Sequence, residues 1–195
     1  MDDLYEALIN GANIEDVLNA KYDANMLGAQ KLGSKVSIGG KNYIVLDHSY
    51  GWTSLITDRS VEYREFDNSS ADYERSSIRQ WLNTDYYRSL CEAVGADNIK
   101  KHAVDLVADN GTNKGQSVED FISLITTAKY REFREYIKPI GEWWWTATRV
   151  DTECEDYARD VCCVGSDGVL PWRGGDNGDG GARPFCILNS SILVK

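Results

Sequence analysis

The last quarter of the chain holds the side chains best suited to recognition. Two blocks of apolar and aromatic residues, 143–145 and 181–188, bracket about 35 residues rich in Asp, Gly, Arg, Cys and Tyr that follow neither helical nor strand periodicity. Arginine and tyrosine offer large contact areas with polar ends, while Asp, Asn and Gly offer adaptable hydrogen bonds. The pattern is typical of a binding loop on a rigid scaffold. We therefore predict a binding protein, not an enzyme.

Catalytic and metal-binding chemistry has little support in the sequence. The chain has no serine-hydrolase elbow, phosphate loop, zinc-protease motif or kinase motif, and its only histidines are His48 and His102. The cysteines are odd in number and show no CxxC spacing, so we expect free thiols instead of disulfides or a zinc site; they are Cys91, Cys154, Cys162, Cys163 and Cys186. We predict no catalytic residue, no metal and no cofactor.

Composition limits the partners and the compartment. The chain has 195 residues and a formal net charge of −10, from 21 Lys and Arg against 31 Asp and Glu. This charge repels phosphate backbones, so we expect no nucleic-acid partner. No run approaches the roughly 18 apolar residues of a membrane helix, and the first residues lack the basic flank of a signal peptide. We expect one main domain that folds in a cytosol and does not insert into a membrane.

Strand signals and then helix signals precede the binding segment. Residues 35–38 and 43–46 flank the turn pair Gly39-Gly40, and residues 52–57 continue the pattern, which predicts an antiparallel meander. Ser76 and Ser77 open a predicted helix that extends to about Cys91, with apolar residues on one face. Residues 1–30 have a loosely helical rhythm and predict two short helices.

A second helix is predicted after Ser117, because Asp120 follows at capping-box spacing and the apolar residues after it share one face. Residues 128–137 either prolong this helix or form a separate short one, and Pro139 ends it. Strands are predicted at residues 158–164 and 187–194, with a flexible glycine-rich run at residues 174–181 between them. Strands, two helices and a long irregular region that returns to strand predict an α+β fold.

Four motifs occur in order along the chain, at residues 77–83, 118–125, 143–148 and 181–188. Together they resemble a family of bacterial and phage domains with a C-type-lectin-like fold, related to formylglycine-generating enzymes. Many members are variable proteins of diversity-generating retroelements. The resemblance spans roughly residues 33–195 and implies two helices packed on small antiparallel sheets with long irregular loops. Residues 1–32 lie outside it, and we expect them to be a helical attachment or assembly segment.

The resemblance also implies a diversified segment at about residues 146–182. In such systems an error-prone reverse transcriptase rewrites adenines of a template copy, so codons of the AAC and AAT type diversify. Codons that end in a pyrimidine cannot encode Lys, Gln, Glu, Met or Trp. Between Thr146 and Ala182 these types occur only at Glu153, Glu155 and Trp172, which are therefore expected to be fixed. The predicted ligand-binding residues are Arg149, Asp151, Asp156, Tyr157, Arg159, Asp167, Arg173, Asp176, Asn177 and Asp179.

The blocks that flank this segment have structural roles in the prediction. Trp143, Trp144 and Trp145 are expected in the core, with at least one of them near the binding surface because strand neighbours point to opposite faces. Arg183, before Pro184, is expected to hold the base of the loop by binding backbone carbonyls or a carboxylate. We assign it no catalytic role.

The implied function is receptor recognition by a phage virion protein that is assembled in the bacterial cytoplasm. Its expected partners are a bacterial surface receptor, protein or glycan, and other virion proteins or further copies through residues 1–32. Two alternatives remain open. One is an oxidase of the formylglycine-generating type, which would need a pair of metal-binding cysteines. The other is a calcium-dependent lectin with a constant site, for which residues 176–179 supply candidate oxygen ligands.

Overall fold

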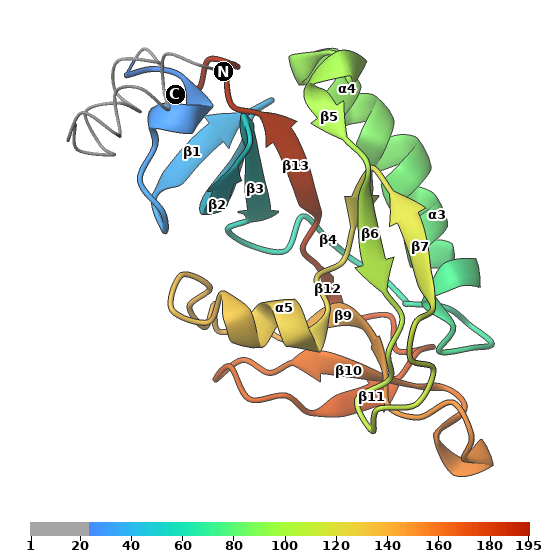
Figure 1. Ribbon diagram of the computed structural model, residues 1–195. Helices are drawn as coiled ribbons and strands as arrows, with labels where there is room; N and C mark the ends of the chain where they lie inside the picture. Colours follow the sequence, from blue (N-terminus) through green and yellow to red (C-terminus); the bar gives the residue numbers. More distant parts are fainter. Residues whose placement is uncertain (1–23) are drawn as a thin grey trace.

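The computed structural model describes residues 24–195 and is shown in Figure 1. Strands dominate, helices are few and short, and irregular connections are long. The predicted α+β class is therefore confirmed at this level. The two helices predicted within residues 1–30 lie mostly outside the described residues. The described end of that range contains a 3-10 turn, η1 (Leu27–Ala29).

The larger sheet has the strand order β1-β2-β3-β13-β5, and β8 also pairs with β13. Its pairs are all antiparallel, and its strands are β1 (Lys35–Ile38), β2 (Lys41–Ser49), β3 (Trp52–Thr57), β5 (Ile99–Lys100), β8 (Ile122–Ser123) and β13 (Phe185–Asn189). The predicted meander of residues 35–57 is confirmed. Its first turn places Gly39 and Gly40 at φ 56° and 75°, a conformation that glycine adopts without steric cost.

The smaller sheet has the order β11-β10-β9-β12-β4, and β6 and β7 form a separate two-stranded sheet. These strands are β4 (Glu62–Tyr63), β6 (His102–Asp105), β7 (Ser117–Asp120), β9 (Trp144–Arg149), β10 (Asp160–Val164), β11 (Trp172–Gly174) and β12 (Gly181–Ala182). The strand predicted at residues 158–164 is thus present, two residues shorter, because the 3-10 turn η5 (Glu155–Tyr157) precedes it. The strand predicted at 187–194 is β13. It ends at Asn189, whose Oδ1 accepts the amide of Ser191 and turns the chain.

The predicted helix after Ser76 is present and extends to Val94. It consists of α3 (Ser77–Trp81), a π-helical segment η3 (Leu82–Tyr86) and α4 (Tyr87–Val94), flanked by the 3-10 turns η2 (Tyr73–Arg75) and η4 (Ala96–Asn98). Ser76 caps it as expected, with its Oγ 3.3 Å from the Arg79 amide. Gly95, at φ 83°, ends it. In Figure 1 this helical unit runs beside β5, β6 and β7.

The prediction of a helix after Ser117 is wrong. Ser117–Asp120 forms β7, which pairs with β6, and Ile122–Ser123 forms β8. Exposure alternates along β7, with Val118 and Asp120 buried. Asp120 is buried because its carboxylate receives a bidentate bond from Arg79, at 2.7 to 3.0 Å. The contact with Arg79 thus overrides the local capping-box pattern. The second helix starts later, as α5 (Thr127–Glu132), capped by Thr126.

Two groups of buried side chains make up the core. The larger group joins α3–α4 to both main sheets and includes Trp145, Val161 and Cys163. The smaller group surrounds α5, which lies between the two main sheets in Figure 1, and includes Tyr130 and Trp144. Neighbours on β9 thus contribute to different clusters, as strand alternation requires.

The described part of the predicted attachment segment packs on the C-terminal end of the chain. Leu27 is fully buried, and its amide donates to the Ile192 carbonyl at 2.8 Å. Met26 forms an antiparallel bridge with Leu193. Residues 24–32 are therefore in contact with the main domain. Across residues 24–195, every helix is too short or too polar to cross a membrane.

Candidate functional site

Strand β9 fixes the start of the predicted binding segment. Trp144 and Trp145 are buried, while Trp143 is only partly buried. Trp145 donates from its indole Nε1 to the Arg64 carbonyl at 2.9 Å, so its polar edge is satisfied inside the core. Trp143 stacks edge-on against Trp145 at 4.8 Å and lies under the Arg173 guanidinium at 5.9 Å. The tryptophan block is thus core at two positions and reaches the predicted surface at one.

Arg183 fixes the end of the segment, as the sequence predicted. It is fully buried between β12 and β13, and its Nε and Nη2 donate to the Thr57 carbonyl at 3.0 and 2.8 Å. Its guanidinium also lies 4.7 Å from the ring centre of Trp144. Thr57 belongs to the larger sheet and Trp144 to the smaller one, so this arginine connects the two sheets. Burial lowers the pKa of Arg183 to about 10. This pKa is still well above 7, so the guanidinium stays charged at neutral pH.

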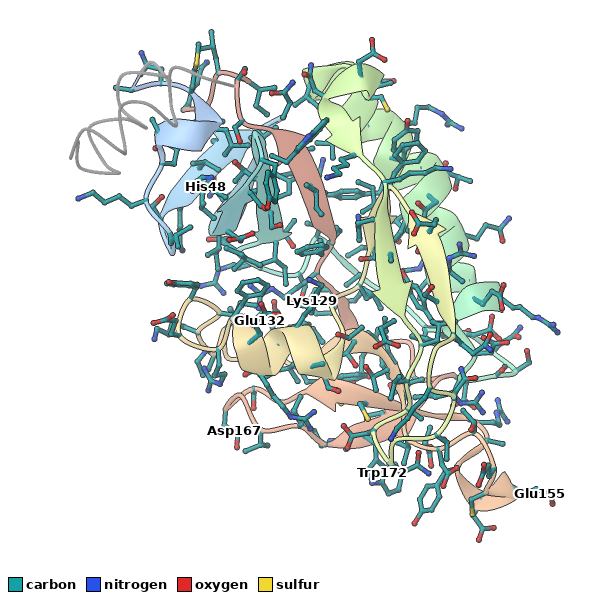
Figure 2. The ribbon with its side chains drawn as sticks, in the orientation of Figure 1. His48, Lys129, Glu132, Glu155, Asp167 and Trp172 are labelled. Carbon is teal, nitrogen blue, oxygen red and sulfur yellow. The ribbon has the colours of Figure 1, made fainter. Side chains whose placement is uncertain are left out.

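Most of the predicted ligand-binding side chains are exposed. Seven of the ten are exposed, namely Asp156, Tyr157, Arg159, Asp167, Arg173, Asp176 and Asp179, and three are partly buried, namely Arg149, Asp151 and Asn177. They come from β9, η5, β11 and the loops between β9 and β12. In Figure 2 the lower edge of the molecule carries Asp167, Trp172 and Glu155, which lie on or between these elements.

The structure brings some of the predicted residues into contact. Arg159 Nη2 lies 3.0 Å from Asp176 Oδ2 and also donates to the Asn68 carbonyl at 2.6 Å. This ion pair links the start of β10 to the glycine-rich loop. Arg149 Nε donates to the Asp151 carbonyl at 2.8 Å, and Asp151 Oδ1 accepts the Glu153 amide. Both contacts order the backbone of the surface.

Other predicted residues lie apart from this group. Asp167 is in the turn between β10 and β11, and its Oδ1 accepts the Val169 amide at 3.1 Å. In Figure 2 it lies at the opposite end of the lower edge from Glu155. Asp179 is in the glycine-rich loop, where its amide contacts Asn177 Oδ1 at 3.5 Å. A single ligand of modest size would therefore not contact all ten residues.

The sequence did not identify Trp172 as a surface residue. Its side chain is 51% exposed on β11, and its ring meets the 37% exposed ring of Tyr157 at 5.9 Å between centroids, nearly perpendicular. Trp172 was predicted to be fixed and was not among the predicted ligand-binding residues. Trp172 pairs in register with Cys162 of β10, and β11 itself is a short edge strand of the smaller sheet.

The loop between β6 and β7, which was not predicted as part of the site, contacts the start of residues 146–182. The amides of Asp109 and Asn110 donate to the carbonyls of Arg149 and Val150, at 3.0 and 3.3 Å. Thr112 Oγ1 lies 2.7 Å from the Thr152 hydroxyl. The loop between β6 and β7 therefore supports the start of the predicted variable segment. No local sequence signal marks this pairing, because the two segments are about 40 residues apart.

Comparison of the chain with protein-family models, with curated proteins and with solved structures found no match.

The cysteines carry free thiols. Burial raises the pKa of Cys162 to about 12 and that of Cys163 to about 11, so both stay protonated at neutral pH. Thiolate is the form that binds metals and attacks electrophiles. In residues 24–195, no group of three or more His, Cys, Asp or Glu side chains is arranged to hold a metal ion.

Residues 176–179 supply the candidate calcium ligands, but side-chain oxygens of this run already make contacts within the protein. Asp176 is paired with Arg159, and Asn177 Oδ1 faces the Asp179 amide. A calcium ion would have to displace the Arg159 contact to use both Asp176 oxygens.

A cavity of about 250 Å³ lies between β6 and α5, apart from the predicted surface. His102 lines it, with Nε2 hydrogen-bonded to Ser123 Oγ at 2.9 Å and its ring edge-on to Phe185 at 5.0 Å. Burial lowers the pKa of His102 from 6.5 to about 4, while the charge of Asp120 opposes this shift. The imidazole is therefore neutral at physiological pH.

Because His102 is buried and neutral, we expect the free energy of unfolding to fall at acidic pH. Below pH 6.5 the unfolded chain binds a proton on His102, whereas the folded chain does not until about pH 4, so stability falls as the pH is lowered through this window. The shift corresponds to about 3 kcal/mol. Urea unfolding at pH 7 and pH 4.5 measures it in the wild type and in His102→Gln, which cannot titrate. The pH-dependent loss should be smaller in the variant, and equal losses would contradict the assignment.

Proposed function

We propose that this chain is a ligand-binding variable protein of a diversity-generating retroelement, with a C-type-lectin-like fold and with residues 146–182 as its diversified segment. The observation that carries the proposal is the separation of exposed side chains from a buried frame. Tyr157, Arg159 and Arg173 expose their side chains, while Trp145 and Arg183 hold the ends of the same segment in the core.

Such a separation allows sequence change without loss of the fold. The central strand β10 is hydrogen-bonded to β9 on one side and to β11 on the other, and four of its five side chains are buried, so the exposed residues around it carry little of the fold. Substitutions at exposed positions away from special features usually alter stability by less than about 0.5 kcal/mol. The surface can therefore vary while the scaffold stays constant, as a repertoire of binders requires.

The proposed mechanism is binding without turnover. Its partner would be a bacterial surface receptor, contacted through the exposed residues of this segment. Residues 1–32 would attach the protein to a virion or to further copies of itself. Burial keeps the thiols of Cys162 and Cys163 protonated, which does not favour their use as the metal-binding pair that the oxidase alternative needs.

Deep sequencing of the coding region across a population of its source tests the proposal. We expect adenine-linked substitutions concentrated in codons 146–182, above all at the exposed positions. The codons for Trp143, Trp144, Trp145, Arg183 and Pro184 should stay constant. The meander, residues 35–57, is the matched control segment, because it lies in the same reading frame and has no expected diversification.

An even spread of substitutions over the meander and the segment would refute the retroelement proposal. So would variation that spares codons 146–182. Either result would make a constant lectin or an enzyme the better hypothesis, and calcium- or copper-linked stabilisation would then be the next measurement.

A further inference from the structure

The segment that carries the exposed aromatic pair has an excess of negative charge. Residues 149–179 contain eight carboxylates and three arginines. Tyr157 and Trp172 are the one pair of exposed aromatic rings in mutual contact within the described part of the chain. The faces of such rings attract cations, and nearby carboxylates add to this attraction.

The three arginines are already engaged within the protein. Arg159 is paired with Asp176. Arg173 lies over Trp143 and donates from Nη1 to the Trp172 carbonyl, and Arg149 donates to the Asp151 carbonyl. Each guanidinium therefore has one nitrogen engaged within the protein, which leaves it less available to an anionic ligand.

The carboxylates near Tyr157 are not neutralised in this way. Glu153, Glu155 and Asp156 are in or next to η5, the turn that carries Tyr157, and none forms an ion pair with any residue from 24 to 195. Asp160, at the start of β10, has its pKa raised first by burial and then by the negative charge of Asp176. A bound cation near Asp160 would relieve its repulsion by Asp176.

We propose that this surface binds a cationic protein segment, with a Lys or Arg side chain of the partner over the rings of Tyr157 and Trp172 and with Glu155 and Asp156 as its ionic partners. The inference rests on the proposed function, whose ligand class it specifies. Glu155 and Trp172 are expected to be fixed, whereas Asp156 and Tyr157 are predicted to vary, so the repertoire would share the part of this preference that Glu155 and Trp172 supply. Neutral glycans are the competing class, since they also stack on aromatic rings, but they would leave the charge excess unused.

Selection from a random 12-residue peptide library against the immobilised chain tests this inference. We expect enriched peptides to be rich in Lys and Arg. Raising NaCl from 50 to 500 mM should weaken their binding about tenfold, because screening reduces attraction between exposed charges. Trp172→Ser should weaken it by about tenfold through loss of the cation–ring contact and of buried area. Asp156→Asn should weaken it about threefold.

The matched control variants change exposed residues outside residues 149–179. Tyr50→Ser removes a 99% exposed ring at the turn between β2 and β3, and Asp97→Asn removes an exposed carboxylate in η4. Neither should change peptide binding. If Trp172→Ser does not fold by circular dichroism, Tyr157→Ser and Asp156→Asn still give the comparison.

Enrichment of acidic or apolar peptides, or failure to enrich any peptide while a glycan array gives ligands, would overturn the cationic assignment. If those ligands still lost affinity in Trp172→Ser, the proposed binding surface would stand. Ligands that bound equally well to Trp172→Ser and Tyr157→Ser would instead contradict the surface itself. The codon survey remains an independent test of diversification.

Discussion

Replacement of Arg183 by methionine is expected to lower the free energy of unfolding by about 4 kcal/mol. Arg183 is fully buried, and its two bonds to the Thr57 carbonyl and its contact with Trp144 are made across the two main sheets. Methionine keeps much of the volume but offers no donor, so the Thr57 carbonyl loses both side-chain donors inside the core. The variant should also weaken binding by the proposed surface, because the end of residues 146–182 loses its anchor.

Urea denaturation followed by tryptophan fluorescence measures this effect. Arg159→Met is the matched control, since it removes an exposed arginine whose ion pair contributes less than about 1 kcal/mol. A loss below about 1 kcal/mol in Arg183→Met would show that the buried guanidinium is replaceable by an apolar chain. Lysine at this position should rescue only part of the loss, because it cannot make the same paired contacts.

The role of Arg183 could be predicted because its signals are local. An arginine between a buried strand and a proline has few ways to satisfy its donors, and nearby carbonyls are the nearest acceptors. The meander of residues 35–57 was predictable for the same reason, since its alternation and its glycine pair are contained in 23 residues. The exposure of Tyr157, Arg159 and Arg173 also followed from composition and the lack of periodicity.

The parts that could not be predicted depend on contacts between distant segments. Trp172 is exposed because β11 is the edge strand of the smaller sheet, and strand order cannot be read from its neighbours in sequence. Asp167 lies apart from the other predicted residues because the β10–β11 turn carries it to the far end of the surface. The loop of Asp109 and Asn110 supports the site through backbone amides, which leave no trace in residue type.

The error at residues 117–125 has the same origin. Ser117 and Asp120 have the spacing of a helix cap, and the apolar residues after them have helical spacing. Asp120 does not cap a helix, because Arg79, 41 residues earlier, binds it with both Nε and Nη2. Asn83 adds to this by accepting the amides of Phe121 and Ile122 on its Oδ1. The first helix thus dictates the conformation of the segment that was predicted to form the second.

We expect Asp120→Ala to lower the free energy of unfolding by about 3 to 5 kcal/mol, because it removes the contact with Arg79. The Asp120 side chain is 1% exposed, so the variant leaves the partly buried Arg79 cation without its partner. Tyr73, whose pKa is raised well above its usual value, first by burial and then by the charge of Asp120, also loses a hydrogen-bond partner. Urea unfolding gives the loss, with Asp85→Ala as the control for an exposed ion pair.

A double replacement separates the cost of an unpaired charge from the value of the pair. In Arg79→Met combined with Asp120→Leu, no charge is left behind, and apolar side chains occupy both positions. We expect the double variant to be more stable than Asp120→Ala, because the unpaired, partly buried Arg79 cation accounts for much of the loss. If the double variant is the less stable of the two, the hydrogen bonds themselves hold residues 117–123 in strands. In that case, circular dichroism should show more helix in the double variant, as the local sequence pattern favours.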